Sequence, residues 1–352
     1  MADGAVIGWD IGGAHVKACL SHRGLVHDVA QWPCPLWQGA VHLDRVLALA
    51  HERWPELAGA QHAVTMTGEL VDRFAHREDG VRRIAEQLAA ALRAPQFFAG
   101  DAGWCEAADA AALWPQIASA NWLASARHTA LALAPESGLW VDIGSTTTDF
   151  IAFRGGAVPT ASRSDAQRLA SGELVYHGVV RTPLCAVARR IGWRGEQLNV
   201  MNEFFATTAD VYRLTGELDP AHDQQPSADH AAKDRDATCA RLARMIGLDA
   251  RDADRDAWLA FAREWRAQQI AELRGQLERV SAAYGLRAPA LLVGAGCGAF
   301  LLPELAPPGW RCLSYGRNVA RLATQAAPDA RAWAEVCAPS VAVAALFDRD
   351  RR

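Results

Sequence analysis

The sequence lacks an excess of basic residues, since 36 lysines and arginines stand against 40 aspartates and glutamates, for a formal net charge of −4. Without a basic surface we expect no binding to nucleic acid. No apolar run approaches the roughly 18 residues of a membrane span, and MADGAVIGWDIGG at the start has no basic stretch before its apolar segment. We therefore expect a cytoplasmic protein with no signal peptide and no membrane contact.

The eight cysteines are scattered and form no CxxC pair. This spacing predicts neither a disulfide framework nor a metal cluster, and it favours structural thiols in a reducing compartment. The sequence also contains no Walker A motif, no HExxH and no GxSxG. It therefore gives no sign of a P-loop nucleotide site, a zinc protease of that type or an α/β-hydrolase nucleophile.

The 352 residues are 51% hydrophobic, which suits two globular domains with sizeable cores. Strands are predicted at 5–11, 15–20 and 24–32, and the pattern restarts with strands at 138–144, 148–156 and 157–160. We place one domain at 1–135, closed by C-terminal helices from about 325 to 352. The second, 136–324, contains a helical insertion at about 200–284 and a glycine loop at 291–300.

Helical spacing predicts helices at 43–54, 79–92, 115–133 and 254–284. Residues 218–237, LDPAHDQQPSADHAAKDRDA, are polar, charged and proline-containing, and we interpret them as an exposed, mobile loop.

Two stretches of the sequence match each other, WDIGGAHVK from Trp9 and VDIGSTTTD from Val141. In each, an aspartate (Asp10 or Asp142) ends a buried strand and a glycine follows. Glycine lets backbone N–H groups approach a ligand closely, and successive N–H groups form a concave anion site. An aspartate beside a phosphate requires a cation, so the pair predicts Mg²⁺ or another divalent ion. The predicted phosphate-binding residues are Gly12, Gly13, Lys17, Gly144, Ser145, Thr146 and Thr147.

A third glycine turn, Gly294–Ala295–Gly296, follows the buried strand ALLV. It either approaches the sugar and base of a nucleotide such as ATP or closes a turn. Together the three turns, in this order, resemble the actin, Hsp70 and sugar-kinase superfamily. That resemblance implies a two-lobed α/β fold, the actin-like (ribonuclease H-like) fold, with duplicated mixed sheets flanked by helices and a cleft between lobes.

Within the superfamily the chain is similar to the hydantoinase/oxoprolinase group, and to its short branch associated with tetrahydromethanopterin-linked one-carbon transfer and methanofuran biosynthesis. TMTGELVDRF, SGELVYHGVVRTPLCAV and MNEFFATTADVYRLTGEL carry this similarity. The branch implies condensation of an aminomethylfuran diphosphate with glutamyl-tyramine or a related phenol, with diphosphate leaving. The partners expected are thus small phosphorylated molecules, and a homodimer is a further possibility.

Such a reaction needs an acid–base group near the phenol oxygen and positive charge near the phosphates. Ala14 stands where relatives often carry a hydroxyl, which puts ATP hydrolysis in doubt, and His15 follows it. In the third motif, Glu203, Thr207 and Asp210 would share one face if that segment were helical. The candidate catalytic residues are Asp149, His15, Glu69, Arg181 and Glu203, each of which has an ordinary structural alternative as a turn, cap, packing or surface residue.

Three other functions compete with the condensing enzyme. The first is an ATP-dependent ring-opening or amide-activating enzyme, and the second is a nucleotide-binding scaffold without turnover. The third is a dinucleotide enzyme, because GAGCGA fits G-x-G-x-x-A, but position 314, 20 residues beyond Gly294, is a serine instead of an acid. The sequence leaves open the acceptor, the metal, the oligomeric state, the use of ATP and which carboxylate or histidine is the base.

Overall fold

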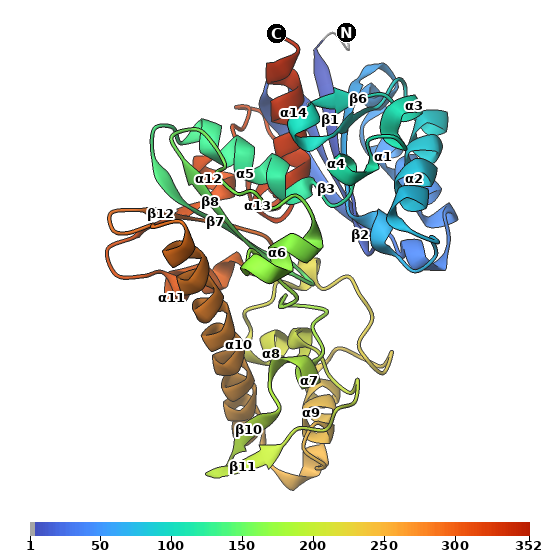
Figure 1. The fold of residues 1–352 in the computed structure, drawn as a ribbon. Coiled ribbons are helices and arrows are strands. Elements are labelled where there is room, and N and C mark those ends of the chain that lie inside the picture. The colour runs from blue at the N-terminus through green and yellow to red at the C-terminus, as the bar shows by residue number, and fades with distance from the viewer. Residues whose placement is uncertain (1–3) are drawn as a thin grey trace. The chain divides into compact units, whose positions relative to one another are not determined.

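The computed structural model describes residues 4–352, which divide into two units. The first contains the residues up to Trp140, together with Ile151–Ser171 and Leu313–Arg352, and the second contains Val141–Phe150 and Gly172–Cys312. The first unit therefore combines the two ends of the chain. Figure 1 shows this combination in the red helix α14 (Ala338–Asp350), which lies beside the blue strand β1 (Ala5–Ile11).

The first unit is built on a six-stranded mixed sheet with the order β3-β2-β1-β4-β5-β6. Strand β1 pairs antiparallel with β2 and parallel with β4. The remaining strands are β2 (His15–His22), β3 (Leu25–Pro33), β4 (Gln61–Met66), β5 (Gln96–Phe98) and β6 (Trp104–Cys105).

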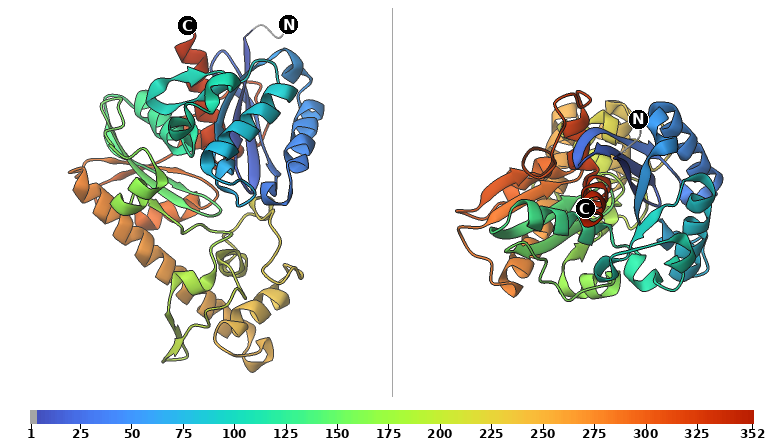
Figure 2. Two further views of the ribbon diagram at one scale, coloured as in Figure 1. Left: turned by 45° about the vertical axis from the view of Figure 1, so that its right-hand side comes forward. Right: turned by 90° about the horizontal axis from the view of Figure 1, so that it is seen from above.

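The two faces of this sheet differ because successive side chains of a strand point to opposite sides. Ile7, Trp9 and Ile11 face a core that includes α1 (Val41–Arg53) and α2 (Arg77–Ala91). The other face is covered by α14, which lies so close that a Cβ on Gly8 would be 2.0 Å from the Ser340 carbonyl oxygen. Figure 2 shows α14 in red beside these blue strands in both views.

The second sheet has the order β13-β12-β7-β8-β9, formed by β7 (Ser137–Ile143), β8 (Thr148–Arg154), β9 (Leu174–Val175), β12 (Leu291–Ala295) and β13 (Arg311–Ser314). Counted along the chain, this order repeats that of β3-β2-β1-β4-β5. The matched sequence stretches are therefore the first hairpins of two equivalent sheets. The strand predicted at 157–160 is wrong, because only Ala157 forms a bridge, to Arg154.

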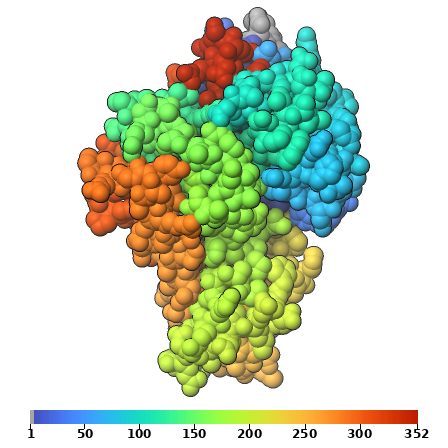
Figure 3. All heavy atoms as spheres, viewed as in Figure 1, coloured from blue at the N-terminus to red at the C-terminus, as the bar shows by residue number. Residues whose placement is uncertain are grey.

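The helices of the second unit enclose a hydrophobic core of their own. The long helix α10 (Arg255–Ala283), predicted at 254–284, packs against α7 (Leu184–Val187), α8 (Thr208–Thr215), α9 (Arg235–Arg244) and the hairpin of β10 (Arg190–Trp193) with β11 (Glu196–Asn199). Trp258, Phe261 and Trp265 form the buried side of α10. Figure 3 shows its outer side in orange next to yellow-green atoms of the α7–β10 segment.

The helix predicted at 115–133 is interrupted. The structure has α4 (Trp114–Ile117) and α5 (Asn121–Ala132), and between them Ser119 takes a left-handed backbone conformation with φ of 53°. Ala118 forms an isolated parallel bridge with Met66, at the end of β4. This tertiary contact overrides a local sequence that contains no glycine or proline at the break.

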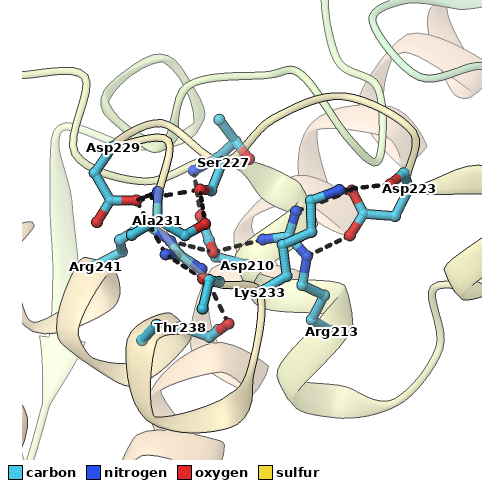
Figure 4. A network of polar contacts seen from close by, with 12 residues as sticks. Asp210, Arg213, Asp223, Ser227, Asp229, Ala231, Lys233, Thr238 and Arg241 are labelled. Carbon is cyan, nitrogen blue, oxygen red and sulfur yellow. Dashed lines mark hydrogen bonds and ion pairs between the residues drawn. The ribbon is translucent and has the colours of Figure 1, made fainter. Parts of the chain in front are cut away.

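Most residues of the polar segment at 218–237 are exposed or half-buried, as expected of an exposed loop, and ion pairs that the sequence did not reveal hold it to its neighbours. Asp223 pairs with Arg213 at 2.5 Å and with Lys233 at 3.0 Å, and Asp229 pairs with Arg241 at 3.1 Å. Figure 4 shows these contacts converging around the buried Asp210, which accepts from Arg241 Nε at 2.7 Å. The network ties the segment to α8 and α9.

The remaining helices are α3 (Ala107–Ala110), α6 (Asp165–Ser171), α11 (Leu302–Leu305), α12 (Tyr315–Asn318) and α13 (Ala330–Val336). Within residues 4–352 no single helix has the length and hydropathy of a membrane span, and only α13 and α14 taken together reach them, with a bend of 97° between the two.

Candidate functional site

The two matched hairpins make the same turn. In the first, the N–H of Gly12 donates to the carbonyl oxygen of His15 at 3.0 Å. In the second, the N–H of Gly144 donates to the carbonyl oxygen of Thr147 at 2.9 Å. The correspondence read from the sequence therefore holds in hydrogen bonding as well as in strand order.

A row of polar side chains crosses the first sheet beside its turn. Lys17 of β2 and Thr65 of β4 are the register partners of Asp10, so the three side chains share one face. Lys17 Nζ lies 3.8 Å from Asp10 Oδ2. Lys17 is thus on an inner strand of the sheet, between β1 and β3.

This row contains two buried oxygen atoms without a hydrogen-bond partner in the part of the chain that the structure describes, Asp10 Oδ1 and Thr65 Oγ1. Asp10 is 3% exposed, and burial raises its pKa while the charge and hydrogen bond of Lys17 oppose the rise. Buried polar atoms normally have partners. These oxygens therefore suit a ligand-bound donor or a hydrated cation.

The second hairpin presents a row of backbone donors. Among residues 4–352 the N–H groups of Ser145, Thr146 and Thr147 donate to no protein acceptor. Successive N–H groups of this kind, with hydroxyls beside them, make an anion-binding concavity. Arg181 adds a positive charge, since its Nη1 lies 3.4 Å from Thr146 Oγ1. The structure thus brings Arg181 to the predicted phosphate loop.

The shape of this loop is set by the segment that carries Arg181. The N–H groups of Val180 and Arg181 donate to the Ser145 carbonyl oxygen at 3.1 and 2.8 Å. A Cβ on Gly178 would be 2.4 Å from Thr146 N, so only glycine fits there. The Gly178 carbonyl oxygen accepts from Gln269 of α10 at 2.9 Å, so α10 stabilises the segment that shapes the loop.

The third glycine turn lies against the second hairpin. Gly296 has a φ of +84°, and a Cβ there would be 2.3 Å from Asp142 Oδ1. The N–H of Gly298 donates to the Ile143 carbonyl oxygen at 2.8 Å. Gly294 lies instead within β12, where a Cβ would meet Leu302 at 2.7 Å, so its lack of a side chain serves packing.

Glu69 lies at the carboxyl end of β4, next to the first hairpin, because a Cβ on its neighbour Gly68 would be 3.1 Å from the Ile11 carbonyl oxygen. It is 1% exposed, and Oε1 lies within hydrogen-bond distance of Ser119 Oγ, at 2.8 Å, while Oε2 has no partner within residues 4–352. Burial raises the pKa of Glu69 to about 7. Glu69 does not cap α2, since His76 does so.

The other candidates are placed differently. His15 begins β2 and Asp149 lies on β8, and both are buried. Glu203 is exposed and precedes α8, which begins at Thr208, so the predicted helical face of Glu203, Thr207 and Asp210 is wrong. Asp210 caps α8 and holds ion pairs instead.

Ser119 was not recognisable as a site residue from the sequence. It is 50 positions from Glu69 and sits in what reads as a continuous helix, so only the fold reveals the contact.

A resident metal cluster is absent from the described range, which holds no group of three or more His, Cys, Asp and Glu able to bind an ion. Mg²⁺ commonly takes one or two carboxylates and completes its shell with water and substrate phosphates. Asp10 and Asp142, one carboxylate near the end of each strand, fit that mode of binding.

Comparison with known proteins agrees with this geometry. The profile described as hydantoinase/oxoprolinase matches residues 61–314. The chain belongs to the hydantoinase/oxoprolinase family. The matched region includes the second hairpin, Glu69 and the third glycine turn, and the first hairpin precedes it.

Two curated relatives carry one name, (4-{4-[2-(gamma-L-glutamylamino)ethyl]phenoxymethyl}furan-2-yl)methanamine synthase. That of Methanocaldococcus jannaschii is 27% identical over 282 residues, 80% of this chain and 83% of the relative. That of Methanococcus vannielii is 29% identical over 147 residues, 42% of this chain and 66% of the relative.

Among solved structures, the nucleotide-free form of acetone carboxylase, an enzyme of ATP-dependent acetone carboxylation, aligns with a TM-score of 0.55 at 14% identity. The alignment covers 97% of this chain and 70% of that one. This likeness concerns the fold alone. With the two mixed sheets and their flanking helices, it confirms the actin-like fold class expected from the sequence.

Proposed function

We propose that this protein condenses an aminomethylfuran diphosphate with glutamyl-tyramine or a related phenol, forming an aryl ether and releasing diphosphate. The observation that carries the proposal is the similarity to the M. jannaschii synthase over 80% of this chain. The name of that relative describes a glutamylated phenoxymethyl furan. An ether of that kind forms when a phenol oxygen replaces a leaving group on a furan-methyl carbon.

The second hairpin supports the departure of diphosphate. As the carbon–oxygen bond breaks, its electron pair remains on the leaving phosphate oxygen, and the N–H groups of Ser145, Thr146 and Thr147 are aimed to bind that charge. Arg181 adds a cation beside Thr146. The furan ring stabilises the positive charge that develops on carbon, so the protein's main task is to bind the leaving group.

The first hairpin is proposed to bind phosphate through the N–H group of Gly13, with Lys17 as a nearby charge. Asp10 and Asp142 would each hold water molecules of a divalent cation in its own hairpin. Such a cation, when bound, neutralises charge on the diphosphate. Ala14 lacks the hydroxyl that relatives often carry at this position, but this difference takes no backbone donor from the turn. Diphosphate binding is therefore compatible with Ala14.

The test is a reaction of the purified protein with the furan diphosphate, the glutamylated phenol and Mg²⁺. We expect the ether to appear by mass spectrometry together with diphosphate, and we expect Asp10→Asn to reduce its rate. Asp348→Asn, a change of another buried aspartate in α14, serves as the control. Absence of ether from the wild-type reaction would remove the proposal.

An ATP-dependent reaction on an amide or ring is the second candidate, and one observation favours it. Gly296 and Gly298 lie directly against Asp142 and Ile143, where a nucleotide sugar would continue from its phosphates. ATP would then be consumed in step with the amide substrate. If the ether forms without any nucleotide, this candidate is excluded.

A further inference from the structure

One serine hydroxyl in the first unit lies within hydrogen-bond distance of two carboxyl groups. Ser119 Oγ is 2.8 Å from Glu69 Oε1 and 3.1 Å from Asp165 Oδ2. A hydroxyl has a single proton to donate. If both carboxyls were ionised, one of these contacts would bring two electron-rich oxygens together, so one carboxyl must supply the second proton.

The surroundings decide which carboxyl is protonated. Asp165 accepts from Arg168 Nη2 at 2.7 Å, which places a positive charge beside it, and its side chain is 14% exposed. Glu69 is 1% exposed, and Gly80 of α2 packs against its backbone. The charged groups that face Glu69 are Asp165, which disfavours its ionisation, and Arg77, which favours it weakly. Glu69 therefore carries the proton.

We propose that Glu69, Ser119 and Asp165 form a proton relay that removes the phenol proton during ether formation; this rests on the proposed function. Glu69 donates from Oε1 to Ser119 Oγ, and Ser119 donates to Asp165 Oδ2. This leaves Glu69 Oε2, which has no partner in the described part of the chain, as the acceptor that faces substrate. Glu69 is then the catalytic residue, and Ser119 and Asp165 are positioning residues.

The step balances without any added reagent. The phenol oxygen forms its bond to the furan-methyl carbon, and the electron pair of the breaking carbon–oxygen bond leaves with diphosphate. The phenol proton moves to Glu69 Oε2 while the proton on Oε1 moves to Ser119 Oγ. The original Ser119 proton passes to Asp165 Oδ2, and from there to water.

The conformation of Ser119 provides a clean variant. Its φ of 53° favours glycine, so Ser119→Gly removes the hydroxyl without backbone strain. Glu69→Gln keeps the shape of the side chain and cannot accept a proton. Glu86→Gln changes an exposed glutamate of α2, with a side chain 59% exposed, and serves as the matched control.

The first measurement needs no substrate. Infrared difference spectra of wild type against Glu69→Gln, taken from about pH 5 to about pH 9, should show a protonated carboxyl that titrates near neutrality. The same signal should titrate at a different pH in Ser119→Gly and in Asp165→Asn. An unchanged titration in both variants would overturn the relay, whatever reaction the protein catalyses.

The second measurement is ether formation. Glu69→Gln should lower kcat by about 100-fold or more while the KM for the diphosphate stays unchanged. Ser119→Gly should lower kcat less and shift the pH at which it is half-maximal, and Glu86→Gln should change neither. Wild-type kcat in Glu69→Gln would refute the relay and leave the condensation intact. If the wild-type protein forms no ether, the proposed function fails. The infrared titration still shows whether Glu69 and Asp165 share a proton through Ser119.

Discussion

Replacing Glu69 with glutamine should remove a pH dependence from the stability of the first unit. Burial raises the pKa of this carboxyl from its ordinary 4.5 to about 7, with Asp165 adding to the rise and Ser119 and Arg77 opposing it. Because the folded pKa lies above the unfolded one, the folded state holds the extra proton between these values. Wild-type stability should therefore fall as the pH rises through this window.

The size of the effect follows from the two pKa values. Their difference of about 2.5 corresponds to about 3 kcal/mol, at about 1.4 kcal/mol for each pH unit. Solvent does not reduce it much, because Glu69 is 1% exposed. Glutamine stays neutral throughout, so the free energy of unfolding of Glu69→Gln relative to wild type should increase by about 3 kcal/mol from below pH 4.5 to above about pH 7.

Scanning calorimetry at a series of pH values measures this difference. One kcal/mol shifts the melting temperature of a domain of 150–250 residues by about 2–4 °C, so the gap between variant and wild type should widen by roughly 6–12 °C. The gap for Glu86→Gln should stay constant. A gap for Glu69→Gln that is the same at about pH 5 and about pH 8 would refute the assignment of a buried, proton-holding carboxyl.

Three further outcomes are expected. Asp142→Asn should lower kcat/KM for the diphosphate substrate by about 10- to 100-fold with little change in melting temperature. The control, Asp348→Asn, should leave kcat/KM unchanged. Equal losses of activity and stability in Asp142→Asn would indicate that the aspartate is purely structural. Gly296→Ala should cost about 1–3 kcal/mol of stability by calorimetry and most of the activity, because a Cβ would strain the left-handed backbone and meet Asp142. Arg241→Ala should destabilise by about 3–5 kcal/mol in urea, since it removes one of the two arginines that pair with the buried Asp210. Limited proteolysis should then cut within 218–237, and resistance to protease there would contradict the role of the ion pairs.

Much of the fold could be predicted because its signals are local. Alternating apolar residues and the repeated Asp-Ile-Gly pattern located both hairpins, and the spacing of Trp258, Phe261 and Trp265 located α10. The superfamily resemblance implied duplicated sheets, and the two strand orders repeat each other. These features depend on neighbours along the chain, which the sequence displays directly.

The features that the sequence did not reveal depend on contacts between distant positions. The break at Ser119 comes from a bridge of Ala118 to Met66. The helical spacing of the sequence does not predict this break. The order in the polar segment comes from ion pairs that cross from Asp223 and Asp229 to α8 and α9. Candidate residues could be found from the sequence where a motif marks them. Partners such as Ser119 could not be found, because only the folded chain brings them to the motif residues.

The most direct test of the account is calorimetric titration of the wild-type protein with pyrophosphate, with and without Mg²⁺. We expect saturable binding that is strong with Mg²⁺ and much weaker without it, because each hairpin has backbone donors beside an aspartate, and an aspartate beside a phosphate requires a cation. No binding of pyrophosphate under either condition would contradict the claim that these hairpins hold a diphosphate.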